Sequence, residues 1–194
     1  MAVVERETAG FGASGRNGGW CSALFPVQSM APAMRDPLAA TIDDIDAVCR
    51  TEGIDCDLVK DGSLELATTP AQLTRLRATL PAVASSPSWL DADQAARLVR
   101  VPGALGGILD PQCAALHPLK LVRGLAAAAQ RHGVELFERS PAERIEPGRV
   151  VLADGEIQAG VVVRATEGYT PALPGLRREL APVYSLIIAT QPLP

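Results

Sequence analysis

An acidic residue and a glycine-rich stretch lie close together near the start of this 194-residue sequence. Glu5 follows the short apolar run Ala2–Val4, and the stretch Gly10–Gly19 reads GFGASGRNGG. A carboxylate at the tip of a strand can accept hydrogen bonds from both hydroxyls of a ribose. Small residues with bare N–H groups suit close approach of a diphosphate, to which Ser14 could donate a hydrogen bond and Arg16 could supply positive charge. The pattern therefore indicates nucleotide binding.

The first part of this stretch, Gly10–Gly15, matches the dinucleotide fingerprint GxGxxG letter for letter. That motif holds a pyrophosphate only where a strand runs straight into it and a helix begins at its end. Here Arg16–Gly19 follows, and its two adjacent glycines make a poor first helical turn. We therefore expect that Gly10–Gly15 is not the phosphate loop. An NAD(P)-binding protein that does use this loop is one alternative.

Composition excludes several other classes of protein. The net charge is −4, and no Lys/Arg cluster offers the basic face that nucleic acid requires. The four cysteines form no CxxC pair, and neither histidine has metal-ligand spacing to a cysteine, so we expect no metal site. No apolar run reaches the roughly 20 residues of a membrane span, and no leader pattern is visible. A cytoplasmic protein is therefore expected.

Apolar spacing and turn residues predict elements that alternate between helices and strands. Helices are expected at 39–49, 70–83, 91–99 and 118–132, and hairpins at 58–66, around Asp61-Gly62, and at 149–157, around Asp154-Gly155. Strands are expected at 2–5, 106–109, 134–137, 161–163 and 183–189. The run Val161–Val163 is β-branched throughout, which is typical of a parallel strand covered on both faces. The order predicts an α/β nucleotide-binding layer interrupted by a second, mixed region.

The longer string from Glu5 to Gly19 resembles the second βα junction of the D-amino-acid oxidase-like family of FAD-dependent oxidoreductases, in the branch containing γ-glutamylputrescine oxidases. In that family the order is a strand, GxGxxG, a helix, a strand that ends in an acid, and an ASGRNGG loop. The sequence contains the last two features and lacks the first three. The resemblance therefore implies a truncated fragment whose first βα unit, roughly 30 residues, is missing.

Later segments continue the resemblance. Residues 107–111 with 117–124 look like the strand and helix before the third nucleotide-domain strand, and 140–145 resembles the segment whose backbone meets the adenine in that family. Residues 161–168 look like the VVxATG strand beside the cofactor, and 182–190 looks like the first strand of the substrate domain. Two positions depart from the family pattern. Ala142 stands where Val is usual, and Glu167 is inserted before Gly168.

By this resemblance the cofactor is FAD, and the expected cofactor-binding residues fall in three segments. They are Glu5, Arg6, Ala13, Ser14, Arg16, Asn17, Gly18 and Gly19, then Ala142, and then Ala165, Thr166 and Gly168. The resemblance assigns no catalytic residue. It implies an incomplete FAD-binding Rossmann-like domain with part of a mixed α+β substrate domain. The expected divisions are 1–36 and 106–180 for FAD binding, 37–105 for an inserted helical and hairpin region, and 181–194 for the start of the substrate domain.

The implied function is that of an FAD-dependent amine or amino-acid oxidoreductase, in which hydride moves from the carbon next to an amine to flavin N5. Its partner would be a small amine or amino acid, with no nucleic acid or membrane. We expect this fragment to be inactive by itself. Besides the NAD(P)-binding alternative, a non-catalytic remnant or interaction module without a cofactor stays open.

Overall fold

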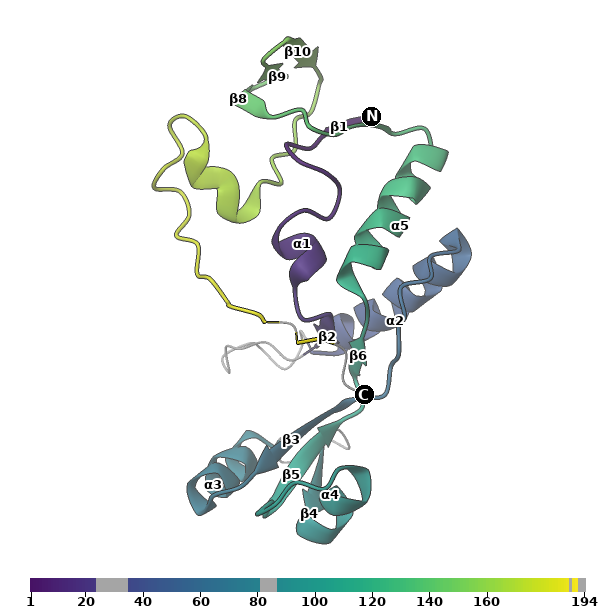
Figure 1. Ribbon diagram of the computed structural model, residues 1–194, viewed down its shortest axis with the longest axis vertical. Helices are drawn as coiled ribbons and strands as arrows, with labels where there is room; N and C mark the ends of the chain where they lie inside the picture. Colours follow the sequence, from purple (N-terminus) through teal and green to yellow (C-terminus); the bar gives the residue numbers. More distant parts are fainter. Residues whose placement is uncertain (24–34, 81–86, 189, 192–194) are drawn as a thin grey trace. The chain divides into compact units, whose positions relative to one another are not determined.

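The computed structural model describes residues 1–23, 35–80, 87–188 and 190–191, and the chain divides into two compact units. The first unit consists of residues 1–18 together with 118–194. The second unit consists of residues 19–117. Figure 1 shows the elements of both units.

A parallel strand pair and one helix form the centre of the first unit. β1 (Ala2–Val4) pairs in parallel with β7 (Glu135–Phe137), with Val3 opposite Leu136. α5 (Pro118–Arg131) begins at a proline, which suits the first helical position. It ends before Gly133, whose φ of 82° permits the left-handed turn that returns the chain to β7. The predictions for β1, α5 and β7 are confirmed.

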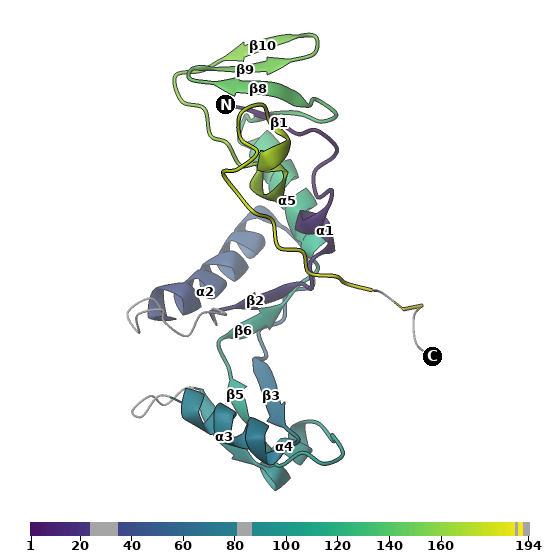
Figure 2. The same cartoon turned by 90° about the vertical axis from the view of Figure 1, so that its left-hand side faces the viewer.

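A three-stranded antiparallel meander follows β7 in the first unit (Figure 2). It consists of β8 (Ala142–Glu146), β9 (Arg149–Leu152) and β10 (Gly155–Gln158), so the predicted hairpin around Asp154-Gly155 is confirmed. Two short helical turns complete the unit. They are α1 (Ala13–Arg16) and the 3₁₀ turn η2 (Glu167–Ala172).

The second unit contains two small sheets, each covered by a helix. β3 (Ser63–Ala67), β5 (Gly106–Asp110) and β4 (Ser88–Asp91) form one antiparallel sheet, against which Leu76 of α3 (Pro70–Thr79) packs in a core with Ala67 and Ile108. β2 (Trp20–Ser22) pairs with β6 (Cys113–Ala115), and Ile42 of α2 (Arg35–Glu52) packs against Ala23 and Ala114. α4 (Ala92–Leu98) follows β4 directly. Strand β5 and helices α2, α3 and α4 match the predictions within the described residues.

The hairpin predicted over 58–66 is wrong. β3 pairs with β5 rather than with residues 58–60, and Val59 instead bridges to Ala115. Gly62, with a φ of 86°, lies so close to β5 that an added Cβ would come within 2.7 Å of the Asp110 carbonyl oxygen. The Asp61-Gly62 turn therefore connects the two sheets of this unit, because Val59 before it pairs with Ala115 and β3 after it pairs with β5.

The strands predicted at 161–163 and 183–189 are also absent from the described residues. Val161 and Val163 are 79% and 81% exposed, and Val183 is 96% exposed; residue 189 lies outside the described residues. No described strand pairs with either run. A β-branched apolar run forms a buried strand only where neighbouring strands satisfy its backbone and cover its side chains.

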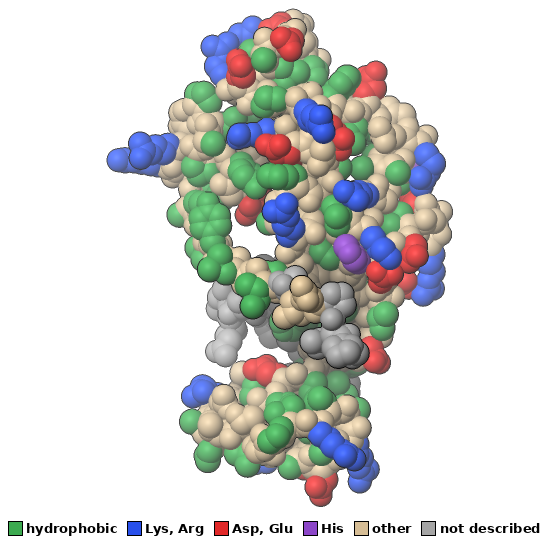
Figure 3. All heavy atoms as spheres, in the orientation of Figure 1, with side chains coloured by type: hydrophobic (Ala, Val, Ile, Leu, Met, Phe, Trp, Pro, Cys, Tyr) green, Lys and Arg blue, Asp and Glu red, His purple; other side chains and the backbone are tan. Residues whose placement is uncertain are grey.

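Charged side chains of both signs share the surface of the described residues. On the face of the described residues that Figure 3 shows, Lys and Arg side chains are interspersed with Asp and Glu. Among the described residues, no helix combines the length and the apolar character that crossing a membrane requires.

Candidate functional site

Glu5 lies at the carboxyl end of β1, where the chain leaves the parallel pair. Its backbone N–H donates to the Phe137 carbonyl, which anchors it to the tip of β7. One carboxylate oxygen, Oε1, accepts a hydrogen bond from the Glu7 amide at 2.8 Å. That bond holds the side chain at the strand tip. Arg6 points to solvent and pairs with Glu7 at 3.5 Å.

The predicted cofactor loop folds into a single tight turn. α1 covers only Ala13–Arg16, and the Asn17 side chain ends it by donating to the carbonyls of Ala13 and Ser14, both at 3.1 Å. The guanidinium of Arg16 lies over the Phe11 ring, 5.7 Å from its centre. Asn17 thus stabilises the turn itself, while Ser14 and Arg16 are exposed on it.

The glycines of the GxGxxG string serve packing. A Cβ at Gly10 would lie 2.5 Å from Cδ1 of Leu119 on α5, and one at Gly15 would overlap the Gly10 carbonyl oxygen. β1 ends at Val4, well before Gly10, and α1 ends at Arg16. The string is therefore neither directly preceded by a strand nor followed by a lasting helix, which are the two requirements of a phosphate-binding fingerprint.

The segment 165–168 leads into the 3₁₀ turn η2, and this turn contacts the glycine stretch. A Cβ at Gly12 would lie 2.5 Å from the hydroxyl oxygen of Tyr169. Thr166 and Thr170 share a hydrogen bond of 2.8 Å between their hydroxyls. Glu167, the residue inserted relative to the family pattern, adopts a φ of 40°. The contact between Tyr169 and Gly12 thus joins a neighbour of Ala13 to a neighbour of Gly168, while direct contacts of the predicted residues with a cofactor stay a prediction.

The remaining predicted residues take separate places. Ala142 begins β8, next to the irregular pairing between Ala142 and Arg144. Gly18 is exposed, and a Cβ there would lie 3.9 Å from Cδ1 of Ile187. Gly19 is the first residue of the second unit, where its carbonyl accepts a hydrogen bond from the Leu116 amide. Its assignment to the cofactor stays a prediction.

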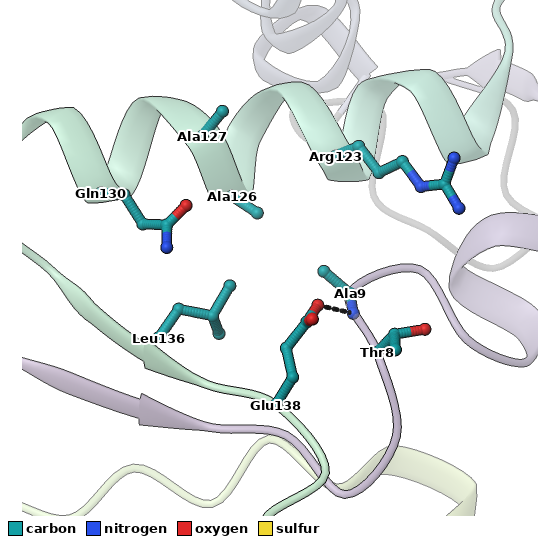
Figure 4. A pocket seen from close by; sticks show the side chains of 8 residues that line it. All are labelled: Thr8, Ala9, Arg123, Ala126, Ala127, Gln130, Leu136 and Glu138. Atoms are coloured by element: carbon teal, nitrogen blue, oxygen red, sulfur yellow. Dashed lines mark hydrogen bonds between the residues drawn. The ribbon is translucent and has the colours of Figure 1, made fainter.

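A cavity of about 430 Å³ opens between α5 and the carboxyl ends of β1 and β7 (Figure 4). It is lined by Thr8, Ala9, Arg123, Ala126, Ala127, Gln130, Leu136 and Glu138. Glu138 accepts a hydrogen bond from the Ala9 amide at 2.7 Å, which ties the loop after β1 to the tip of β7. The cavity adjoins this tip without being lined by any predicted cofactor residue, and its lining carries one charge of each sign, from Arg123 and Glu138.

A second cavity, of about 780 Å³, lies in the same unit between the β8–β9 turn and the segments around Val162 and Leu173. Arg144 and Arg164 line it, but each is already paired, with Glu146 at 3.3 Å and with Glu179 at 2.5 Å. Within the described residues no group of three or more His, Cys, Asp or Glu side chains could hold a metal ion. The arrangement at the β1 tip is therefore the better candidate.

Two residues of the site were not predicted from the sequence. Tyr169 and Leu119 hold the glycine turn from η2 and from α5. The sequence contains a signal for Leu119, which lies on the apolar face of a predicted helix, but nothing in it pairs either residue with the glycine stretch. The glycine-rich composition of 10–19 is a weak signal for such contacts, since a glycine permits close approach without requiring it.

The chain resembles curated and structurally solved oxidoreductases along its whole length. It is 30% identical to a probable oxidoreductase OrdL of Haemophilus influenzae and 27% identical to gamma-glutamylputrescine oxidoreductase of Escherichia coli, with all of this chain and 50% of each relative aligned. The chain thus spans about half the length of these curated relatives. The structure of glycine oxidase from Geobacillus kaustophilus matches 91% of this chain and 51% of its own, with a TM-score of 0.78 and 23% identity.

The fold of that oxidase and the α/β arrangement described above agree. The family model described as "FAD dependent oxidoreductase" matches residues 1–194, which is the entire chain. The family's cofactor is FAD, as the resemblance in the glycine stretch implied. This chain therefore belongs to the DAO family of FAD-dependent oxidoreductases.

Proposed function

We propose that this chain carries part of the FAD-binding region of an amine or amino-acid oxidoreductase, with Glu5 holding the adenosine ribose. The observation that carries this proposal is the placement of the Glu5 carboxylate at the carboxyl end of a parallel pair, with one oxygen held by the Glu7 amide. Ligands of α/β sheets bind outside the carboxyl ends of the strands. A carboxylate there accepts hydrogen bonds from ribose hydroxyls.

The exposed turn Ala13–Arg16 supports contact with the rest of the cofactor. It offers the Ser14 hydroxyl and the Arg16 guanidinium, and its small residues allow close approach. The proposed contact set is completed by Arg6, Asn17, Gly18, Gly19, Ala142, Ala165, Thr166 and Gly168. A helix that begins directly after a strand at a GxGxxG motif, which would hold the diphosphate, is absent from the described residues. The donor set therefore fits part of FAD.

We propose a missing first βα unit as the reason for that partial fit, and residues 181–194 as the start of a substrate domain. The exposure of Val161 and Val163 supports this, because the helix of a βα unit packed on a sheet face would cover such side chains. Bound FAD would supply, at flavin N5, the acceptor for hydride from the carbon next to an amine. This chain's residues would bind and orient the cofactor, and the 194-residue chain alone would be inactive.

The substrate class follows from the relatives' names. One is an oxidoreductase of gamma-glutamylputrescine and one structural neighbour is a glycine oxidase, so a small amine or amino acid is the proposed substrate. The NAD(P) alternative gains no support, because the Gly10–Gly15 string lacks the strand and helix it needs. No observation specifically favours a remnant without a cofactor.

A titration with matched variants tests the role of Glu5. FAD is added to the wild-type chain, to Glu5→Gln and to Glu135→Gln, and binding is followed by flavin fluorescence. Glu135 is the control because it is an exposed carboxylate at the opposite end of the same strand pair. Loss of a charged hydrogen-bond acceptor is expected to weaken FAD about tenfold in Glu5→Gln only.

FMN and NADH distinguish the alternatives in the same titration. FMN lacks the adenosine, so its binding is expected to be equal in the wild type and Glu5→Gln. Equal FAD affinity in all three chains would contradict the assignment of Glu5. Binding of NADH in preference to FAD would favour the NAD(P) alternative.

A further inference from the structure

Tyr169 connects two segments that are far apart in the sequence. Its hydroxyl oxygen lies 2.5 Å from the position that a Cβ on Gly12 would take, and its Cζ lies 3.6 Å from it. The tip of the phenol ring therefore rests on the Gly12 backbone. Gly12 has a φ of 66° and a ψ of −141°, a region open essentially to glycine alone.

The glycine turn is held from two sides. Leu119 of α5 packs on Gly10 and Gly15, and Tyr169 packs on Gly12, which is the residue immediately before α1. No side-chain hydrogen bond caps the start of α1, and these packing contacts lie at that end of the turn.

The 3₁₀ turn η2 holds the backbone of Tyr169 in place. Its amide donates to the Thr166 carbonyl at 2.9 Å, and the Thr166 and Thr170 hydroxyls bond to each other at 2.8 Å. Thr170 is buried, which anchors η2 to its unit. Tyr169 as a whole is 55% exposed, so the residue contacts Gly12 without being a core residue.

We propose that Tyr169 is a positioning residue that fixes the Gly12–Arg16 turn relative to segment 165–168. This inference rests on the proposed function, in which both segments contact FAD. Tyr169 sets the distance between the two segments through its contact with the Gly12 backbone. It acts through the turn and is not assigned a catalytic role.

Hydrogen exchange of the full 194-residue chain tests the contact without any cofactor. The variants are Tyr169→Leu, Tyr169→Phe and the control Tyr184→Leu, which removes the second tyrosine of the sequence, 82% exposed. Tyr169→Leu is expected to speed exchange of amides 10–17 by roughly threefold to tenfold, and Tyr169→Phe by less, because the ring remains. Tyr184→Leu is expected to change nothing there.

The meander β8–β10 is the internal reference for that measurement, since it is hydrogen-bonded within itself. Its exchange is expected to be equal in all four chains. Unchanged exchange of amides 10–17 in Tyr169→Leu, or equal loss of protection in β8–β10, would overturn the proposal.

FAD titration of the same variants separates this inference from the proposed function. Weaker FAD binding in Tyr169→Leu, with recovery in Tyr169→Phe and with unchanged β8–β10, supports the positioning role. Faster exchange of amides 10–17 in Tyr169→Leu, with unchanged FAD affinity, would overturn the effect of Tyr169 on cofactor binding. Absence of FAD binding in the wild type would overturn both the proposed function and the effect of Tyr169 on FAD binding. The hydrogen-exchange result would still test the contact between Tyr169 and Gly12.

Discussion

Gly15 packs against the carbonyl oxygen of Gly10, and Leu119 of α5 closes the same space from the other side. The backbone of Gly15 is helical, so alanine there would meet no conformational penalty. The cost of Gly15→Ala is therefore steric. We predict that Gly15→Ala lowers the free energy of unfolding by about 1–3 kcal/mol, because its Cβ would overlap backbone.

Gly160→Ala is the matched control, because a Cβ at Gly160 would meet nothing within 4 Å. It is expected to change the free energy of unfolding by less than about 0.5 kcal/mol. Urea unfolding of both variants makes the comparison. Equal stabilities would show that the Gly10–Gly15 packing does not form.

At Glu167 a glycine variant is expected to be more stable than an alanine variant, the reverse of the usual order. Its φ of 40° places a residue with a Cβ in the left-handed region, at a cost of about 1–2 kcal/mol. We predict that Glu167→Gly is more stable than Glu167→Ala by about 1 kcal/mol. At Ala127, inside α5, glycine should instead be less stable than the native alanine by about 1 kcal/mol. Alanine exceeding glycine in stability at both positions would refute the strained turn.

Asp91 caps α4 through a reciprocal pair of hydrogen bonds. Its carboxylate accepts from the Gln94 amide at 2.8 Å, and the Gln94 side chain accepts from the Asp91 amide at 2.9 Å. Asp91→Ala is expected to cost about 1 kcal/mol in thermal or urea unfolding. Asp93→Ala removes an acidic residue from the same first turn without this bond and should cost about 0.3–0.5 kcal/mol. If the two variants lose the same stability, charge rather than capping determines the end of α4.

Cys49 and Cys56 predict a dependence of stability on alkaline pH. Their sulfur atoms are 3.7 Å apart, and burial, followed by the hydrogen bond with Cys56, raises the pKa of Cys49 from 9.0 to about 11. Folding thus favours the neutral thiol. Its contribution to stability is full below pH 9.0 and is lost as pH rises through about 11.

Cys49→Ala should lose that part of the pH dependence. The measurement is the difference in free energy of unfolding between wild type and variant from pH 8 to about 11, so that other titrating groups cancel. The difference is expected to shrink as pH rises. A constant difference would mean that the Cys49 pKa is not raised.

Local signals in the sequence predicted much of the fold. The helices predicted at 91–99 and 118–132 and the hairpin around Asp154-Gly155 are each specified by residues close together in the sequence, and each is confirmed. The pairing of strands that are far apart in the sequence was harder to predict. The Asp61-Gly62 turn has the composition of a hairpin, but β3 finds its partner β5 far along the chain.

The exposed valine run shows why buried-strand patterns can mislead. Val161–Val163 has the composition of a covered strand, but coverage depends on neighbours that composition does not contain. At the candidate site, the sequence indicated that Glu5 and the glycine stretch could contact a nucleotide. It did not predict that Tyr169 and Leu119 would hold that stretch, because these contacts join segments with no shared local pattern.

The most direct test of the central claim maps FAD onto the chain by amide chemical shifts, a measurement sensitive to weak binding. An isotope-labelled 194-residue chain is titrated with FAD, and separately with NADH, while its backbone resonances are followed. The account predicts that FAD shifts amides of residues 5–7, 13–18 and 165–168 and leaves α3 and α4 unchanged. FAD shifts confined to other residues, no shifts at all, or larger shifts of residues 10–15 with NADH would contradict it.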